Sequence, residues 1–169
     1  MASVLITGAN ERLSLETARQ LVRAGHTVWL GSRDLGRGEA GTRPVQLDVT
    51  SDESVAAAAE AVAELDVLVN ADLARETFED TLACLARVLH AFLPLLERSS
   101  APVVVNVSGQ PASVSAAAVN MVTVQYAKAF PNVRINAVEP GAASVVRMAQ
   151  IGQDGPTGGY FDADGPLPW

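Results

Sequence analysis

The stretch SVLITGANERLS, residues 3–14, decides the fold of this chain of 169 residues. Its first part, residues 3–7, is a short β-branched and apolar run that ends at Gly8. From Ser14 to Ala24 the apolar residues recur at helical spacing, and Gly25 ends that pattern. A buried strand followed at once by a helix is the unit from which parallel sheets are built. The stretch therefore predicts a parallel sheet whose first strand-to-helix turn lies at residues 7–14.

The same alternation of strand and helix continues along the whole chain. Strand-like runs follow at residues 26–31, 43–49, 66–70, 102–108, 133–138 and 158–162, and helical patterns at 51–65, 75–97, 112–130 and 143–151. Between the second and third strands, residues 35–40 leave room for only a turn or two of helix. The pattern predicts a single α/β domain over residues 1–169, a doubly wound, Rossmann-like parallel sheet with a shortened helix after strand 2.

Composition excludes several classes of protein and partner. Apolar residues make up 49% and charged residues 18% of the chain, which excludes a disordered protein. The net charge of −7 argues against nucleic acid and against an anionic membrane as partners. The apolar runs are too short to cross a bilayer, and residues 1–6 lack the basic start of a signal peptide. The lone Cys84 cannot form an internal disulfide and fits a reducing, cytoplasmic location.

Four motifs in order along the chain resemble those of the short-chain dehydrogenase/reductase family. Residues 7–14 resemble the family's TGxxxGxG loop, and residues 48–50 (DVT) resemble its adenine-binding segment. Residues 66–70 (DVLVN) match the strand that leads into the family's NNAG motif, and residues 136–141 (NAVEPG) match its NAVxPG. The resemblance covers the full length and implies the family's fold. It also implies a truncated member, because the segment after residue 141 that forms the family's substrate lid is missing.

The resemblance implies that four residues would bind a cofactor if the chain holds one. They are Gly8, Arg12, Arg33 and Asp48. Of the family's three loop glycines only Gly8 is kept, and Arg12 would put a bulky side chain where a pyrophosphate lies, unless it contacts the anion itself. We therefore expect no cofactor, with NADP as the alternative. Arg33 supports that alternative, since the family often places an arginine there for the 2′-phosphate of NADP.

The family's catalytic pair is a tyrosine that donates a proton and a lysine, four residues later, that lowers the pKa of the tyrosine. This chain holds one lysine, Lys128, and two tyrosines, Tyr126 and Tyr160. Neither tyrosine lies four residues before Lys128. The resemblance places Ala112 and Ala116 at the two catalytic positions instead, so we expect a degenerate active site.

The remaining candidates for chemistry are polar residues at the carboxyl ends of the predicted strands. Asp72 and Glu139 are the candidate catalytic acid or base, because carboxylates beside apolar walls can have raised pKa values. Ser108 is a third catalytic candidate that could bind a carbonyl oxygen. Each has a structural alternative: Asp72, for example, could cap the helix that follows it. Two distant histidines and one cysteine predict no metal site. Candidate substrate-binding residues are Asn10, Asn70 and Gln110.

Three functions stay open at this point. The preferred one is a non-redox enzyme, of cyclase, isomerase or dehydratase type, that acts on a small-molecule and polyketide-like biosynthetic intermediate. Loss at the substrate end with a preserved sheet favours it. The second is a catalytically silent binding or partner subunit, and the third is an NADP-dependent oxidoreductase with a non-standard proton donor. The helices from Arg75 and from Ala112 match those that pair subunits in the family, which implies a homodimer or homotetramer.

Overall fold

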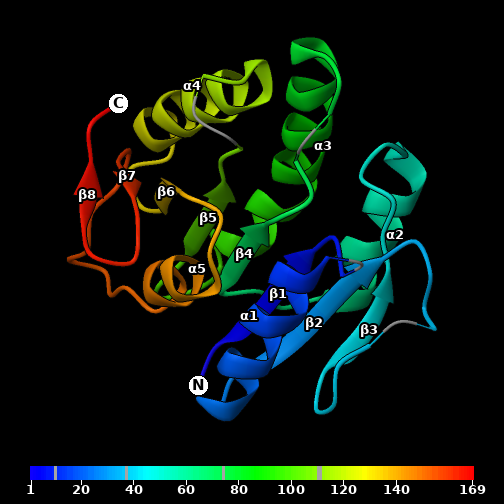
Figure 1. The fold of residues 1–169 in the computed structure, drawn as a ribbon. Coiled ribbons are helices and arrows are strands. Elements are labelled where there is room, and N and C mark those ends of the chain that lie inside the picture. The colour runs from blue at the N-terminus through cyan, green and yellow to red at the C-terminus, as the bar shows by residue number, and fades with distance from the viewer. Residues whose placement is uncertain (10, 37, 74, 110–111) are drawn as a thin grey trace.

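The computed structural model describes residues 1–9, 11–36, 38–73, 75–109 and 112–169. In these residues one eight-stranded sheet runs through the molecule in the order β3-β2-β1-β4-β5-β6-β7-β8 (Figure 1). The strands are β1 Ser3–Thr7, β2 Thr27–Ser32, β3 Arg43–Gln46, β4 Val67–Asn70, β5 Val103–Val107, β6 Arg134–Val138, β7 Tyr160–Phe161 and β8 Pro166–Leu167. The helices are α1 Arg12–Arg23, α2 Asp52–Val62, α3 Phe78–Leu96, α4 Val114–Ala129 and α5 Ala142–Ala149. The pairs from β3 to β7 are parallel, which confirms the predicted doubly wound sheet.

Helices cover both faces of the sheet (Figure 1). On one face α2, α3 and α4 pack against fully buried strand residues such as Leu5, Leu68 and Val104. On the other face α1 and α5 pack against Ile6 and Val69, which are also fully buried. Neighbouring residues of one strand point to opposite faces, so a strand covered on both sides must be apolar at every position. This is why the strand-like runs of the sequence do not alternate with polar residues.

The strand order reverses between β1 and β4. The chain runs outward from β1 through β2 to β3, crosses back to β4, and then runs outward again through β5 and β6. The loops after β1 and β4 therefore diverge and open a crevice at the carboxyl edge of the sheet. The Thr7 hydroxyl holds the floor of this crevice, since its oxygen accepts hydrogen bonds from the backbone N–H groups of Ala71 (3.0 Å) and Asp72 (3.4 Å).

Two connections differ from their predicted form. The described residues between β2 and β3 form turns and no helix, so this crossover is even shorter than expected. Helix α3 begins at Phe78 and not near Arg75, because the side chain of Thr77 accepts a hydrogen bond from the backbone N–H of Asp80 and caps the helix. Asp72 therefore does not cap α3, and the residues just before the helix line the crevice instead.

The chain returns to the sheet after α5 through a short connection. Residues 150–159 form only turns and bends, as expected when the lid segment is missing. The predicted tail contains β8, which pairs antiparallel with β7 and brings the last residues beside α4 (Figure 1). Among the described residues, no helix combines the length and apolarity needed to cross a membrane.

Candidate active site

Three cavities follow one another along the carboxyl edge of the sheet. The first, here the arginine cavity, has a volume of about 280 Å³, and its lining includes Gly8, Arg33, Asp48, Thr50, Asp72 and Arg75. The second, the serine cavity, has about 110 Å³, and its lining includes Glu11, Leu13, Leu73, Ser108, Val119 and Pro140. The third, the aromatic cavity, has about 420 Å³, and its lining includes Ser108, Asn120, Glu139, Tyr160, Pro168 and Trp169. Ser108 belongs to both the second and the third, so it forms the wall between them.

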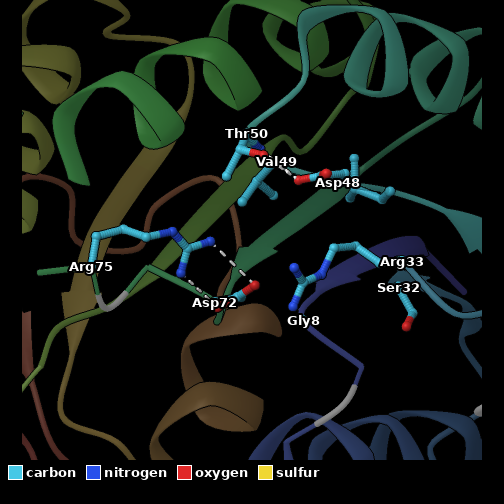
Figure 2. Close-up of a pocket in the computed structure, with 10 residues that line it drawn as sticks. Gly8, Ser32, Arg33, Asp48, Val49, Thr50, Asp72 and Arg75 are labelled. Atoms are coloured by element: carbon cyan, nitrogen blue, oxygen red, sulfur yellow. Dashed lines mark hydrogen bonds and ion pairs between the residues drawn. The ribbon is translucent and has the colours of Figure 1, made fainter. Parts of the chain in front are cut away.

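Two arginines reach into the arginine cavity from opposite sides, Arg33 from the end of β2 and Arg75 from the segment before α3 (Figure 2). Asp48 follows β3 in the same cavity, and its Oδ1 accepts hydrogen bonds from the backbone N–H (2.9 Å) and the hydroxyl (2.6 Å) of Thr50. These two bonds, helped by the charges of Arg33 and Arg75, hold the pKa of Asp48 below its usual range. The carboxylate therefore stays charged at neutral pH and remains an acceptor.

Asp72 and Arg75 form an ion pair in the arginine cavity (Figure 2). The Arg75 Nη1 lies 3.0 Å from Asp72 Oδ1, and Nη2 lies 3.3 Å from Oδ2. The structure thus separates the two carboxylates predicted as acid or base. Asp72 lies beside a cation in the first cavity, whereas Glu139 lies in the third, together with Ser108.

The loop after β1 leaves the crevice open. Arg12, expected to fill the pyrophosphate position, is exposed and lines a depression on the outer face of α1 together with Glu16 and Arg19. Ser14, at the position of the family's third glycine, is fully buried, and its hydroxyl donates to the Thr7 carbonyl oxygen at 3.4 Å. Neither side chain lines any of the three cavities. Asn10, a predicted substrate-binding residue, lies outside the described residues.

Glu11 stands at the start of α1 and lines the serine cavity. Burial raises the pKa of this carboxyl, the negative charge of Asp72 raises it further, and the positive charge of Arg75 opposes both. The rest of the cavity is mostly apolar, with Leu13 and Pro140 among its walls. The serine cavity is thus the smallest of the three cavities and is largely apolar.

The aromatic cavity holds groups that the sequence did not point to. The Ser108 hydroxyl donates to Oδ1 of Asn120, on α4, at 2.9 Å. Tyr160 stacks on Trp169 with ring centroids 5.7 Å apart and planes inclined by 18°. Burial raises the pKa of Tyr160, and the negative charge of Glu139 adds to this. Asn120 and Trp169 were missed because neither lies at the end of a strand, and only the pairing of β7 with β8 brings Trp169 here.

Asn70, predicted to bind substrate, lies below the crevice. Its side chain is fully buried, and its Nδ2 donates to Oδ1 of Asn106 at 2.9 Å. Asn106 in turn donates to the Thr123 hydroxyl at 3.0 Å. Asn70 therefore joins β4, β5 and α4 and lines none of the three cavities. Gln110, the remaining substrate-binding candidate, lies outside the described residues, and among those described no three His, Cys, Asp or Glu side chains cluster around a possible metal ion.

Comparison with known proteins identifies consistent relatives in sequence, although no protein-family model matches the chain. A short-chain dehydrogenase/reductase of Stachybotrys chlorohalonatus is 29% identical, with 96% of this chain and 88% of the relative aligned. That alignment runs over 243 positions, more than the 169 residues of the chain, so the relative carries residues that this chain lacks. The (+)-neomenthol dehydrogenase of Arabidopsis thaliana is 30% identical, over 62% of this chain and 52% of its own length. The chain thus spans about half the length of several relatives that it matches.

Solved structures show the same fold. Menthone neomenthol reductase from Mentha piperita superimposes with a TM-score of 0.86 at 24% identity, over 96% of this chain and 98% of that one. Salutaridine reductase from Papaver somniferum gives a TM-score of 0.84 at 20% identity, over 95% and 99%. An oxidoreductase from Brucella ovis, solved in complex with a partially ordered NAD, gives 0.79 at 18% identity, over 95% and 98%.

These relatives correct the functional prediction. Their names describe dehydrogenases and reductases, which contradicts the non-redox cyclase, isomerase or dehydratase expected from the sequence. Nothing in the comparisons supports describing the site as degenerate. The error came from treating the absence of a Tyr–Lys pair, whose tyrosine donates a proton, as the loss of redox chemistry. The sequence left two alternatives for the cofactor, none or NADP. The relatives, one of them solved with NAD, fit the second alternative better than the first.

Proposed function

Because the chain belongs to the short-chain dehydrogenase/reductase family, we propose that it is an NADP(H)-dependent oxidoreductase acting on a small molecule. The observation that carries the proposal is the arginine cavity, where the Arg33 guanidinium, the Asp48 carboxylate and Gly8 lie together. The residues of this cavity can be tested one by one against the parts of the cofactor.

The 2′-phosphate end fits Arg33. A guanidinium offers a planar fork of N–H donors that matches phosphate oxygens, and Arg33 reaches into the cavity from the end of β2 (Figure 2). β2 itself ends at Ser32, so no carboxylate stands at the strand end to bind a free ribose 2′-hydroxyl. This difference favours NADP over NAD.

The adenine end fits Asp48. Its lowered pKa keeps the carboxylate charged, and a charged carboxylate accepts a hydrogen bond from an exocyclic amino group. Leu47 and Val49 flank it in the same cavity and supply an apolar edge for a flat ring.

The pyrophosphate region also fits. Gly8 has no side chain, and the adjacent start of α1 presents backbone N–H groups without a side-chain cap. Arg12 points to the outer face of α1, so it does not occupy the phosphate position. When bound, the reduced cofactor supplies a hydride to the substrate carbon.

At the substrate end, this chain has no Tyr–Lys pair that could supply a proton to the substrate. Ser108 and Tyr160 are hydroxyl-bearing residues of the aromatic cavity that have taken up partners. Ser108 donates to Asn120, and Tyr160 stacks on Trp169. We therefore assign Ser108 and Tyr160 to binding and orienting the substrate. Neither takes over proton donation from the family's tyrosine.

Titration of the purified protein with NADPH and NADH, followed by calorimetry, tests the proposal. We expect micromolar binding of NADPH and binding of NADH weaker by about tenfold, since one charged phosphate contact contributes on the order of 1.4 kcal/mol or more. Arg33→Ala should remove the preference, whereas Arg23→Ala, an exposed arginine at the far end of α1, should keep it. Absence of NADPH binding, or an unchanged preference in Arg33→Ala, would reject the proposal.

A further inference from the structure

Two polar groups of the aromatic cavity, the Ser108 hydroxyl and the Glu139 carboxylate, can accept hydrogen bonds from a ligand. Ser108 gives its proton to Asn120 at 2.9 Å, which leaves the lone pairs of Ser108 available. Glu139 lines the cavity beside Tyr160, and its carboxylate, when charged, can only accept hydrogen bonds. The Ser108 hydroxyl and the charged Glu139 carboxylate therefore accept. A ligand that binds to these two groups has to bring the hydrogen-bond donors.

The apolar part of the cavity consists of aromatic rings and methyl groups. Tyr160 and Trp169 stack face to face, and Trp169 stays 58% exposed, so part of its ring remains available to a ligand. The face of an aromatic ring attracts a cation through its quadrupole. Ala112 and Ala116, at the positions of the family's tyrosine and lysine, line the same cavity and leave room for the body of a ligand.

The charge of the cavity points the same way. Among the described residues that line it, Glu139 carries the only ionisable acid or base other than Tyr160, and there is no lysine or arginine. The whole chain carries a net charge of −7, which adds a favourable long-range field for cations. An anionic substrate would be repelled by the charge of Glu139 and would find no lysine or arginine among these residues to compensate it.

From this combination we infer that the aromatic cavity binds an organic cation, and that the substrate is an iminium ion reduced to an amine. The inference rests on the proposed function and names its substrate class. In the reaction, a hydride from the reduced nicotinamide forms a C–H bond at the iminium carbon, and the C=N π pair becomes the nitrogen lone pair. The two electrons of the hydride balance the reduction, and no proton enters at this step.

This chemistry accounts for the missing Tyr–Lys pair. Reduction of a ketone leaves an alkoxide that needs a proton donor, whereas an iminium ion already carries its proton on nitrogen. Alanine at positions 112 and 116 then does not slow the reaction, because no proton donor is needed. Ser108 and Glu139 accept hydrogen bonds from the N–H group of the cation. One substrate class thus explains both what the cavity contains and what it lacks.

Binding of a matched pair of bicyclic probes tests the cavity without turnover. The probes are 1,2,3,4-tetrahydroisoquinoline, a cation at neutral pH, and uncharged 1-tetralol, with affinity measured by calorimetry. We expect the amine to bind at least about tenfold more tightly and to change the fluorescence of Trp169 but not that of a Trp169→Leu variant. Glu139→Gln should abolish the preference, whereas Glu97→Gln, which removes the same charge at the end of α3, should keep it.

Turnover then tests the reaction itself. With NADPH, the protein should reduce 3,4-dihydroisoquinoline at least about tenfold faster than 1-tetralone, and the rate should fall as pH rises above the pKa of the iminium. Equal or tighter binding of 1-tetralol, a preference that survives Glu139→Gln, or faster reduction of the ketone would overturn the inference. Failure of NADPH to bind would instead reject the proposed function, while the amine preference would still be measurable on the protein alone.

Discussion

Gly8 and Asp72 approach each other so closely that a side chain on residue 8 has no room. A Cβ built on Gly8 would lie 2.3 Å from the Cβ of Asp72 and 3.2 Å from its backbone nitrogen and Cα. The backbone of Asp72 cannot retreat easily, because its N–H and that of Ala71 are bonded to the Thr7 hydroxyl. Gly8 also has a φ of +75°, which favours glycine. Two loops of the crevice are thus fitted together at this point.

Gly8→Ala should therefore destabilise the protein and disturb the arginine cavity. The left-handed backbone alone costs about 1–2 kcal/mol for alanine, and the contact with Asp72 adds to this. Gly25→Ala is the matched control, because Gly25 has a φ of +90° but, in the described part of the chain, no heavy atom within 4 Å of the added Cβ. Chemical denaturation should show a larger loss for Gly8→Ala, and calorimetry should show weaker NADPH binding for that variant alone. Equal losses in the two variants would contradict the fitted contact.

More of the fold than of the candidate site could be predicted from the sequence. Buried strands and capped helices have local sequence signals: Ser51, directly before α2, accepts a hydrogen bond from the backbone N–H of Ser54 at 3.2 Å. The orientation of the Arg12 side chain has no such local signal, because it depends on how α1 is rotated against the sheet. The aromatic cavity depends on Trp169 returning to Tyr160 through β8, and a strand of two residues has no periodicity to detect. Contacts between distant segments were the part that the sequence could not supply.

The buried chain of side chains from Asn70 to Thr123 should be essential for stability. Asn106→Ala would leave the amide of Asn70 without its acceptor and open a cavity, at a cost of about 2–4 kcal/mol. Thr123→Val keeps the shape but removes the acceptor of Asn106, and should cost about 1–3 kcal/mol. Thr17→Val is the control, since the Thr17 hydroxyl is buried and has no hydrogen-bond partner among the described residues. Urea denaturation should find this control as stable as the parent or more so, and a loss as large as that of Thr123→Val would contradict the assignment.

Ala63 holds a strained backbone at the end of α2, and its replacement by glycine should stabilise the protein. Its φ is 61° and ψ is −42°, and the backbone N–H of Glu64 donates to the Val62 carbonyl at 2.7 Å across this tight turn. Ala63→Gly should relieve about 1 kcal/mol. Ala56→Gly, at an exposed position inside α2, should instead cost about 1 kcal/mol. Thermal unfolding of the two variants should therefore shift in opposite directions, and a lower melting temperature for Ala63→Gly would refute the strain.

Protonation of His26 should weaken the protein below neutral pH. Its Nδ1 accepts the backbone N–H of Ala2 at 3.1 Å, and its Nε2 lies 2.9 Å from the amide nitrogen of Gln150. Burial lowers the pKa of His26, and the positive charge of the amino terminus adds to this. The folded protein thus favours the neutral ring. The contribution is complete above the unfolded pKa of about 6.5 and is lost as pH falls through that value toward the folded pKa.

His26→Asn isolates this effect, because its side-chain oxygen can accept the Ala2 N–H group and does not titrate. The free energy of unfolding should be measured by urea denaturation at pH 7.5 and at pH 5 for both proteins. Carboxylates lower the stability of both at acid pH, so only the difference between the proteins reports on His26. We expect the parent to lose more stability than His26→Asn over this interval. Equal losses would show that the neutral ring contributes nothing to the link between β1, β2 and the end of α5.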